Sequence, residues 1–187
     1  MNKHGPAFAL TVLILSGCAT AARVDQMTVD STASPQHTGD TPLKGSVSVE
    51  TVSGGEGTNP LWTSEIGNEE FRSALENSLR AARLLATDVS ESRYTLKATL
   101  VSVQQPMVGF DMTVTTTVLY ALSDRSVNAA VFEKSITTPY TATVGDAFLG
   151  FERLKLANEG SARNNIAQLI DELYRLQITP ADVSMLP

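Results

Sequence analysis

Few side chains in this sequence could take part in covalent or metal chemistry. Of 187 residues, one is a cysteine, Cys18, and two are histidines, His4 and His37. A lone cysteine cannot form a disulfide within the chain. The cysteine and both histidines precede position 43, where the folded region is expected to begin. That region therefore has no Ser-His-Asp triad, Cys-His pair or ordinary zinc site. We therefore expect neither a metal nor a cofactor.

Carboxylates are the remaining candidates for catalysis, because a pair of them can act as general acid and base. Asp111, Asp124, Glu133 and Asp146 fall near expected turns or strand ends and share no motif. A solvated surface explains their positions better than an active site does. We therefore expect that the protein is not an enzyme.

The N-terminus has the organisation of a secretory signal. It has a basic residue at Lys3, an apolar stretch over residues 7–15, and two small residues, Ser16 and Gly17, before Cys18. The apolar stretch is shorter than the ~20 residues that a membrane-spanning helix needs. An ordinary signal peptide followed by an incidental cysteine is the simpler alternative.

The sequence Leu15-Ser16-Gly17-Cys18 resembles the lipobox of bacterial lipoproteins. The resemblance implies cleavage before Cys18, a thioether-linked diacylglycerol on its thiol, and a further acyl chain such as palmitate on the new amino group. Two or three chains anchor a protein stably, whereas one chain binds only marginally. Ala19 resembles the residue of outer-membrane-directed lipoproteins. We therefore expect an outer-membrane lipoprotein that faces the periplasm, with the inner membrane as the alternative.

Composition and charge restrict the partners that the chain can bind. The formal net charge is −6 and no basic cluster occurs, which argues against nucleic acid as a partner. A polybasic patch for anionic lipid is also absent, so the acyl chains are expected to form the membrane contact while the domain stands off the surface. Four segments are expected: a signal peptide over residues 1–17, the lipidated cysteine with a flexible polar tether over 18–42, an α+β domain over 43–178, and a tail over 179–187.

Hydrophobic spacing predicts the elements of this domain. Alternating patterns predict strands and 3.6-residue patterns predict helices, in the order β-α-β-β-β-α, over residues 46–52, 68–86, 94–100, 112–122, 132–140 and 148–176. Gly160 is expected to bend the last helix or divide it in two. The predicted fold class is α+β, a four-stranded, mostly antiparallel sheet with two helices on one face. Its other face is rich in threonine and would meet water or a partner.

A surface for a partner is predicted from two segments of this domain. Gln105, Met107 and Phe110 lie in a loop that is more apolar than solvent alone would favour, and such clusters often mark contacts. Arg153 and Arg163 lie along the final helix. The alternatives are that the loop folds back on the core and that the helix presents a solvated face.

The layout resembles that of small α+β accessory lipoproteins of the bacterial envelope. This resemblance implies a non-catalytic accessory or assembly factor in an envelope complex, with the membrane contacted through the lipid anchor and an envelope protein as partner. Two alternatives stay open. One is a lipid- or glycan-binding module that uses the cleft between helices and sheet, and the other is an enzyme that acts on envelope polymers.

Overall fold

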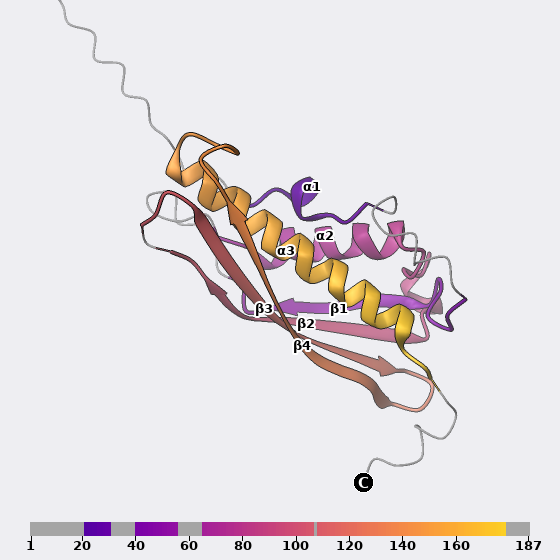
Figure 1. Ribbon diagram of the computed structural model, residues 1–187. Helices are drawn as coiled ribbons and strands as arrows, with labels where there is room; N and C mark the ends of the chain where they lie inside the picture. Colours follow the sequence, from indigo (N-terminus) through magenta and orange to yellow (C-terminus); the bar gives the residue numbers. More distant parts are fainter. Residues whose placement is uncertain (1–20, 31–39, 56–64, 107, 179–187) are drawn as a thin grey trace, which may run out of the picture.

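The computed structural model describes residues 21–30, 40–55, 65–106 and 108–178 (Figure 1). Cys18, Met107 and the predicted tail lie outside them. The elements in chain order are α1 (Val24–Met27), β1 (Val47–Ser53), α2 (Asn68–Ala81), the short 3-10 helix η3 (Val89–Glu91), β2 (Tyr94–Gln104), β3 (Met112–Asp124), β4 (Ala129–Ala142) and α3 (Gly150–Arg175).

The four strands lie side by side in their sequence order, β1-β2-β3-β4. β1 and β2 are parallel, while β2–β3 and β3–β4 are antiparallel. Parallel neighbours need a crossover connection, which α2 supplies, whereas antiparallel neighbours are joined by shorter loops. The predicted α+β fold, with its order β-α-β-β-β-α and mostly antiparallel sheet, is confirmed.

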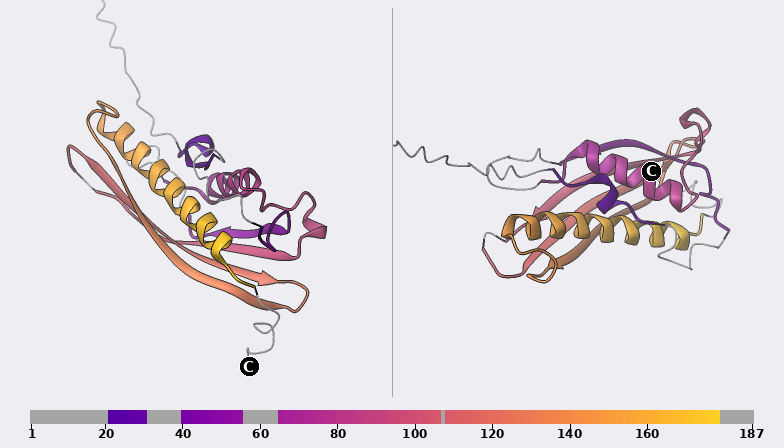
Figure 2. Two further views of the ribbon diagram at one scale, coloured as in Figure 1. Left: turned by 45° about the vertical axis from the view of Figure 1, so that its right-hand side comes forward. Right: turned by 90° about the horizontal axis from the view of Figure 1, so that it is seen from above.

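The helices α2 and α3 cover one face of the sheet (Figure 2). The layer between these helices and the sheet is filled with fully buried side chains from both, including Phe71, Leu75, Leu79, Tyr94, Leu96, Tyr120, Leu122, Ile166, Leu169 and Leu173. Within the described residues, no helix covers the opposite face. Threonine hydroxyls pair across β3 and β4 there, Thr113 with Thr141 (2.8 Å) and Thr117 with Thr137 (3.0 Å). As expected, one face of the sheet is covered by helices and the other carries threonine side chains.

Residues 21–30, part of the predicted flexible tether, pack against the domain. Ala22, Met27 and Val29 are buried, and α1 contacts both α2 and α3 (Figure 2). The backbone N–H of Val29 also donates to the Ser78 hydroxyl at 2.8 Å. These three apolar residues are not spaced with the period of a helix or a strand, so the polar composition of the segment suggested disorder. The groove between two helices nevertheless buries them.

The helix α3 is continuous from Gly150 to Arg175 and is not divided at Gly160. A Cβ atom at Gly160 would stand 2.4 Å from the nearest atoms of the Tyr140 ring. The glycine is therefore required by the close approach of the helix to β4. Its role is one of packing, and the expectation that it divides the helix in two was wrong.

Buried polar groups join α3 to the middle of the sheet. The Asn165 amide donates to the carbonyl oxygens of Thr116 (3.1 Å) and Ile136 (2.9 Å), and its oxygen accepts from the Tyr120 hydroxyl (2.9 Å). The hydroxyls of Thr116 and Ser161 lie 2.7 Å apart. Because buried polar groups are costly unless they are paired, this network fixes the position of α3 along the sheet.

Candidate functional site

The structure brings three of the predicted surface residues to one end of the domain. Gln105 and Phe110 lie in the connection between β2 and β3, and Arg153 lies in the first turn of α3. The Gln105 amide donates to Asn158 Oδ1 of α3 at 3.2 Å, which ties this loop to the helix. Arg163 lies further along α3. Met107 and Cys18 are outside the described residues.

Exposed apolar side chains gather at this end of the domain. Because Met112, at the start of β3, pairs with Ala142, at the end of β4, the loop before β3 and the connection after β4 lie at the same end of the sheet. Phe110 is 86% exposed and Phe148 is 85% exposed. We call this surface the phenylalanine tip; its members are Val108, Phe110, Phe148, Leu149 and Phe151, all of them exposed.

Hydrogen bonds fix the backbone of the connection between β4 and α3, which carries part of the tip. Arg153 is buried, and its Nη1 donates to the carbonyl oxygens of Ala147 (2.9 Å) and Phe148 (2.7 Å). The Asp146 carboxylate accepts from the backbone N–H (2.7 Å) and hydroxyl (2.9 Å) of Thr143, and these bonds lower the pKa of Asp146. Phe148 is thus displayed on an ordered connection between β4 and α3.

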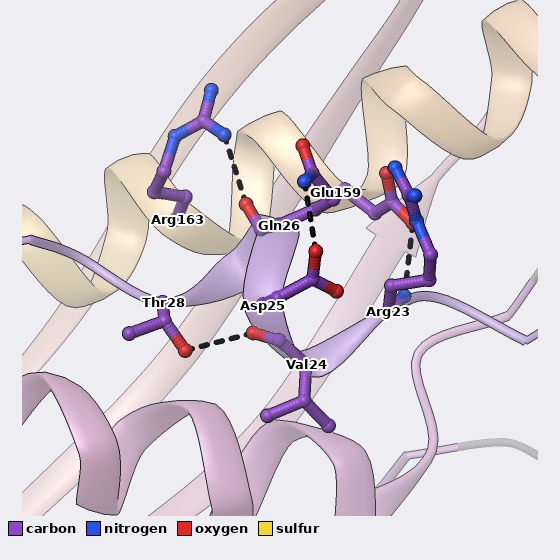
Figure 3. A network of polar contacts seen from close by, with 7 residues as sticks. All are labelled: Arg23, Val24, Asp25, Gln26, Thr28, Glu159 and Arg163. Carbon is purple, nitrogen blue, oxygen red and sulfur yellow. Dashed lines mark hydrogen bonds and ion pairs between the residues drawn. The ribbon is translucent and has the colours of Figure 1, made fainter.

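A second polar cluster, which we call the α1 clamp, fixes the N-terminal segment to α3 (Figure 3). The backbone N–H of Arg23 donates to Glu159 Oε1 at 2.9 Å, and its side chain forms an ion pair with the same oxygen at 3.4 Å. Arg163 Nη1 donates to the carbonyl oxygen of Gln26 at 2.8 Å. Its guanidinium also lies 5.8 Å from the centre of the Tyr140 ring. Arg163 therefore acts within the chain, as Arg153 does.

The carboxylates considered for catalysis are divided between the two ends of the sheet: Asp111 and Asp146 lie near the start of β3, whereas Asp124 ends β3 and Glu133 pairs with Ala121 close to it. Asp124 is buried and accepts hydrogen bonds from Arg93 Nη2 (2.7 Å) and from the backbone N–H of Ser126 (2.9 Å). The Arg93 guanidinium is the main reason why the pKa of Asp124 is lowered to about 2. Within the described ranges, no group of three or more His, Cys, Asp or Glu residues could hold a metal ion.

Only a weak sequence signal pointed to the tip, and none pointed to the clamp. Phe148 and Phe151 fit the expected start of a helix, where an aromatic side chain can equally be buried. Both stand within two residues of Gly150, and the sequence pattern alone did not show that their side chains are exposed. Arg23 and Glu159 are 136 positions apart, and no sequence pattern links them.

No family model and no curated protein matches the chain, but solved structures resemble it. A protein from Xanthomonas campestris has 11% identity and a TM-score of 0.53, covering 70% of this chain and 84% of its own. A hypothetical protein from Chlamydia trachomatis has 10% identity and a TM-score of 0.51, covering 70% and 98%. A minor lipoprotein from Acinetobacter baumannii has 12% identity and a TM-score of 0.48, covering 71% and 92%.

The first two of these structures establish a shared fold. The chain therefore has an α+β architecture found in other bacterial proteins. Among the helices of the described residues, none is both long and apolar enough to cross a membrane.

Proposed function

We propose that the chain is a lipoprotein of the bacterial envelope, anchored through Cys18 in the outer membrane and facing the periplasm. There it serves as a non-catalytic accessory or assembly factor for an envelope protein complex. The observation that carries this proposal is the Leu15-Ser16-Gly17-Cys18 motif after a short apolar stretch. It assigns the lone thiol of the chain a chemical role as the site of lipid attachment.

The structure supports a position next to the membrane. Residues 22–29 are fixed to α2 and α3, and Ala21 is three positions after Cys18. A chain spans at most about 3.6 Å per residue, so Cys18 lies within about 11 Å of Ala21. The domain is therefore held beside the bilayer instead of standing off on a long tether. A protein held this way is suited to contact partners in or on the same membrane.

The bonding of the buried carboxylates supports a non-catalytic role. A general acid or base works best when its pKa lies near the working pH. The pKa of Asp124 is instead lowered to about 2 by its bonds to Arg93 and Ser126. Glu159, also buried, is bound to Arg23. Both groups are bonded to arginine side chains within the fold, and the alternative of an enzyme acting on envelope polymers would need other residues.

A second candidate function is the binding of a lipid or glycan. The layer between the helices and the sheet is filled by the core, but a cavity of about 340 Å³ lies beside the ends of β1 and β2. Its lining includes Gly54, Ile66, Leu100 and Val103. This volume is within the usual range for small-ligand sites. Mass spectrometry of the purified protein should then detect a co-purifying ligand that Leu100→Trp displaces.

Fractionation of cells tests the anchor. Cys18→Ala should leave the domain folded but release it from the membrane fraction. A control variant, Cys18→Ala with Thr20→Cys, returns a thiol to the chain outside the motif and should also be released. A Cys18→Ala protein that stays with the membrane would contradict the proposed anchor.

Crosslinking in cells tests the accessory role. Photo-crosslinking amino acids at Thr113 and Thr141, both exposed on the open sheet face, should capture an envelope protein. Capture should disappear in the Cys18→Ala background, because the domain is no longer held at the membrane. A protein that forms no crosslink from either position and purifies as a monomer would count against this role.

A further inference from the structure

The phenylalanine tip is an apolar surface that the fold leaves open to solvent. Phe110 and Phe148 come from two different connections, and both side chains are more than four-fifths exposed. Exposed apolar clusters of this kind mark contacts with a partner or a membrane. Arg153 and Asp146 hold the connection that carries Phe148 in a fixed shape. The tip is therefore displayed on an ordered scaffold.

The N-terminal segment runs along α3 towards the side of the tip. Arg23 binds Glu159, while Gln26 binds Arg163, so the chain followed backwards from α1 runs towards the start of α3 (Figure 1). Glu159 is eight residues from Phe151, or about 12 Å along the helix at 1.5 Å per residue. Cys18 lies within about 11 Å of Ala21 because only two residues separate them. The first described residues after Cys18 and the tip are thus on the same side of the domain.

We propose that the phenylalanine tip inserts into the membrane leaflet that holds the acyl chains of Cys18, an inference that rests on the proposed lipid anchor. Aromatic and apolar side chains suit the boundary between headgroups and acyl chains. With the anchor in place, insertion is an intramolecular event, so a small apolar surface is sufficient. The acyl chains supply affinity, and the tip sets the orientation of the domain.

The charges around the tip indicate which force drives the insertion. Asp111, Asp146 and Glu152 each stand within two residues of an exposed phenylalanine in the sequence, and the buried Arg153 guanidinium donates to carbonyl oxygens. Anionic headgroups would gain nothing from such a rim. Insertion should therefore occur in neutral phosphatidylcholine vesicles and should not weaken as the salt concentration rises.

Fluorescence quenching on the lipidated, full mature protein tests this inference. Acylated Cys18 has no free thiol, so Phe110→Cys or Phe148→Cys introduces a single site for an environment-sensitive dye. The control, Val127→Cys, lies in the turn between β3 and β4 at the far end of β3, about 40 Å away. All three side chains are exposed, so the variants should fold.

In phosphatidylcholine vesicles, the dyes at positions 110 and 148 should be quenched by nitroxide-labelled lipid and shielded from iodide, whereas the dye at position 127 should show the reverse. Phe148→Ser should lower the inserted-to-free ratio of the position-110 dye at least about tenfold, since burial of one phenylalanine is lost.

Three results would overturn the inference. Protein that floats with the vesicles while all three dyes stay open to iodide would show an anchor without an inserted tip, leaving the proposed function intact. Dyes shielded from iodide but not quenched by the lipid would show that a second copy of the chain covers the tip. Protein that does not float with vesicles would refute both the anchor and the insertion.

Discussion

Arg153 fixes the connection between β4 and α3, and Arg153→Met should loosen that connection while the domain stays folded. The guanidinium donates to the carbonyl oxygens of Ala147 and Phe148 at 2.9 and 2.7 Å. Methionine keeps most of the aliphatic stem of the buried arginine but removes the charge and both hydrogen bonds. The expected effect is therefore local, at the base of the phenylalanine tip.

The magnitude follows from two opposing contributions. Two hydrogen bonds from a charged donor contribute about 3 kcal/mol, at about 1.5 kcal/mol each. Among the described atoms, the buried Nε of Arg153 has no hydrogen-bond partner, and such a donor costs about 1–3 kcal/mol. Replacing arginine removes this cost too. We expect a net loss of up to about 2 kcal/mol, which raises the opening constant of the connection up to about 30-fold.

Millisecond hydrogen exchange at the amides of Asp146 and Ala147 measures this opening, because both donate to the carbonyl oxygen of Thr143. The matched control is Arg163→Met on the same helix, which should instead speed exchange at Val29 by weakening the α1 clamp. Unchanged protection of Asp146 in Arg153→Met would refute the role assigned to Arg153. So would an equal loss of protection in both variants.

Two further predictions concern stability. The ionised Asp124 carboxylate stabilises the fold above pH ~3.8, its ordinary pKa, and this contribution is lost as the pH falls through its folded pKa of about 2. Asp124→Asn should therefore lower the free energy of unfolding by about 1–2 kcal/mol at pH 7. This loss is smaller than the full pKa shift implies, because the Arg93 side chain is half exposed. Urea denaturation should show a smaller difference at pH 3 than at pH 7, and a difference independent of pH would contradict the assignment. Gly160→Ala should destabilise the protein by about 1–3 kcal/mol through overpacking against Tyr140, although alanine favours a helix by about 1 kcal/mol. In a Tyr140→Ala background the same change should be neutral or stabilising in thermal unfolding, and a loss of equal size there would exclude the ring contact as the cause.

The elements with the strongest periodicity could be predicted from the sequence. The alternation along β3 and the helical spacing of Phe71, Leu75 and Leu79 in α2 are local patterns, because each buries one face of a single element. The mostly antiparallel sheet and the two helices on one face followed from these patterns and their order. The position of Phe110 in an apolar loop was also evident, although the sequence left open whether the side chain is buried.

Features that depend on distant contacts could not be predicted. The burial of Met27 requires α2 and α3 to meet, and the role of Gly160 requires the ring of Tyr140 beside it. The two arginines of α3 looked like surface residues, since helical spacing does not reveal bonds to Phe148 or Gln26. Arg163 binds a carbonyl oxygen in a distant segment, and Arg153 binds those of the irregular connection just before its helix.

The central claim is that Cys18 attaches the domain to a membrane, and intact-protein mass spectrometry of material extracted from membranes tests it most directly. The account predicts a mature chain that begins at Cys18 and carries the mass of a diacylglycerol and a further acyl chain. A chain that begins at another residue, or one that keeps an unmodified Cys18 thiol, would contradict it.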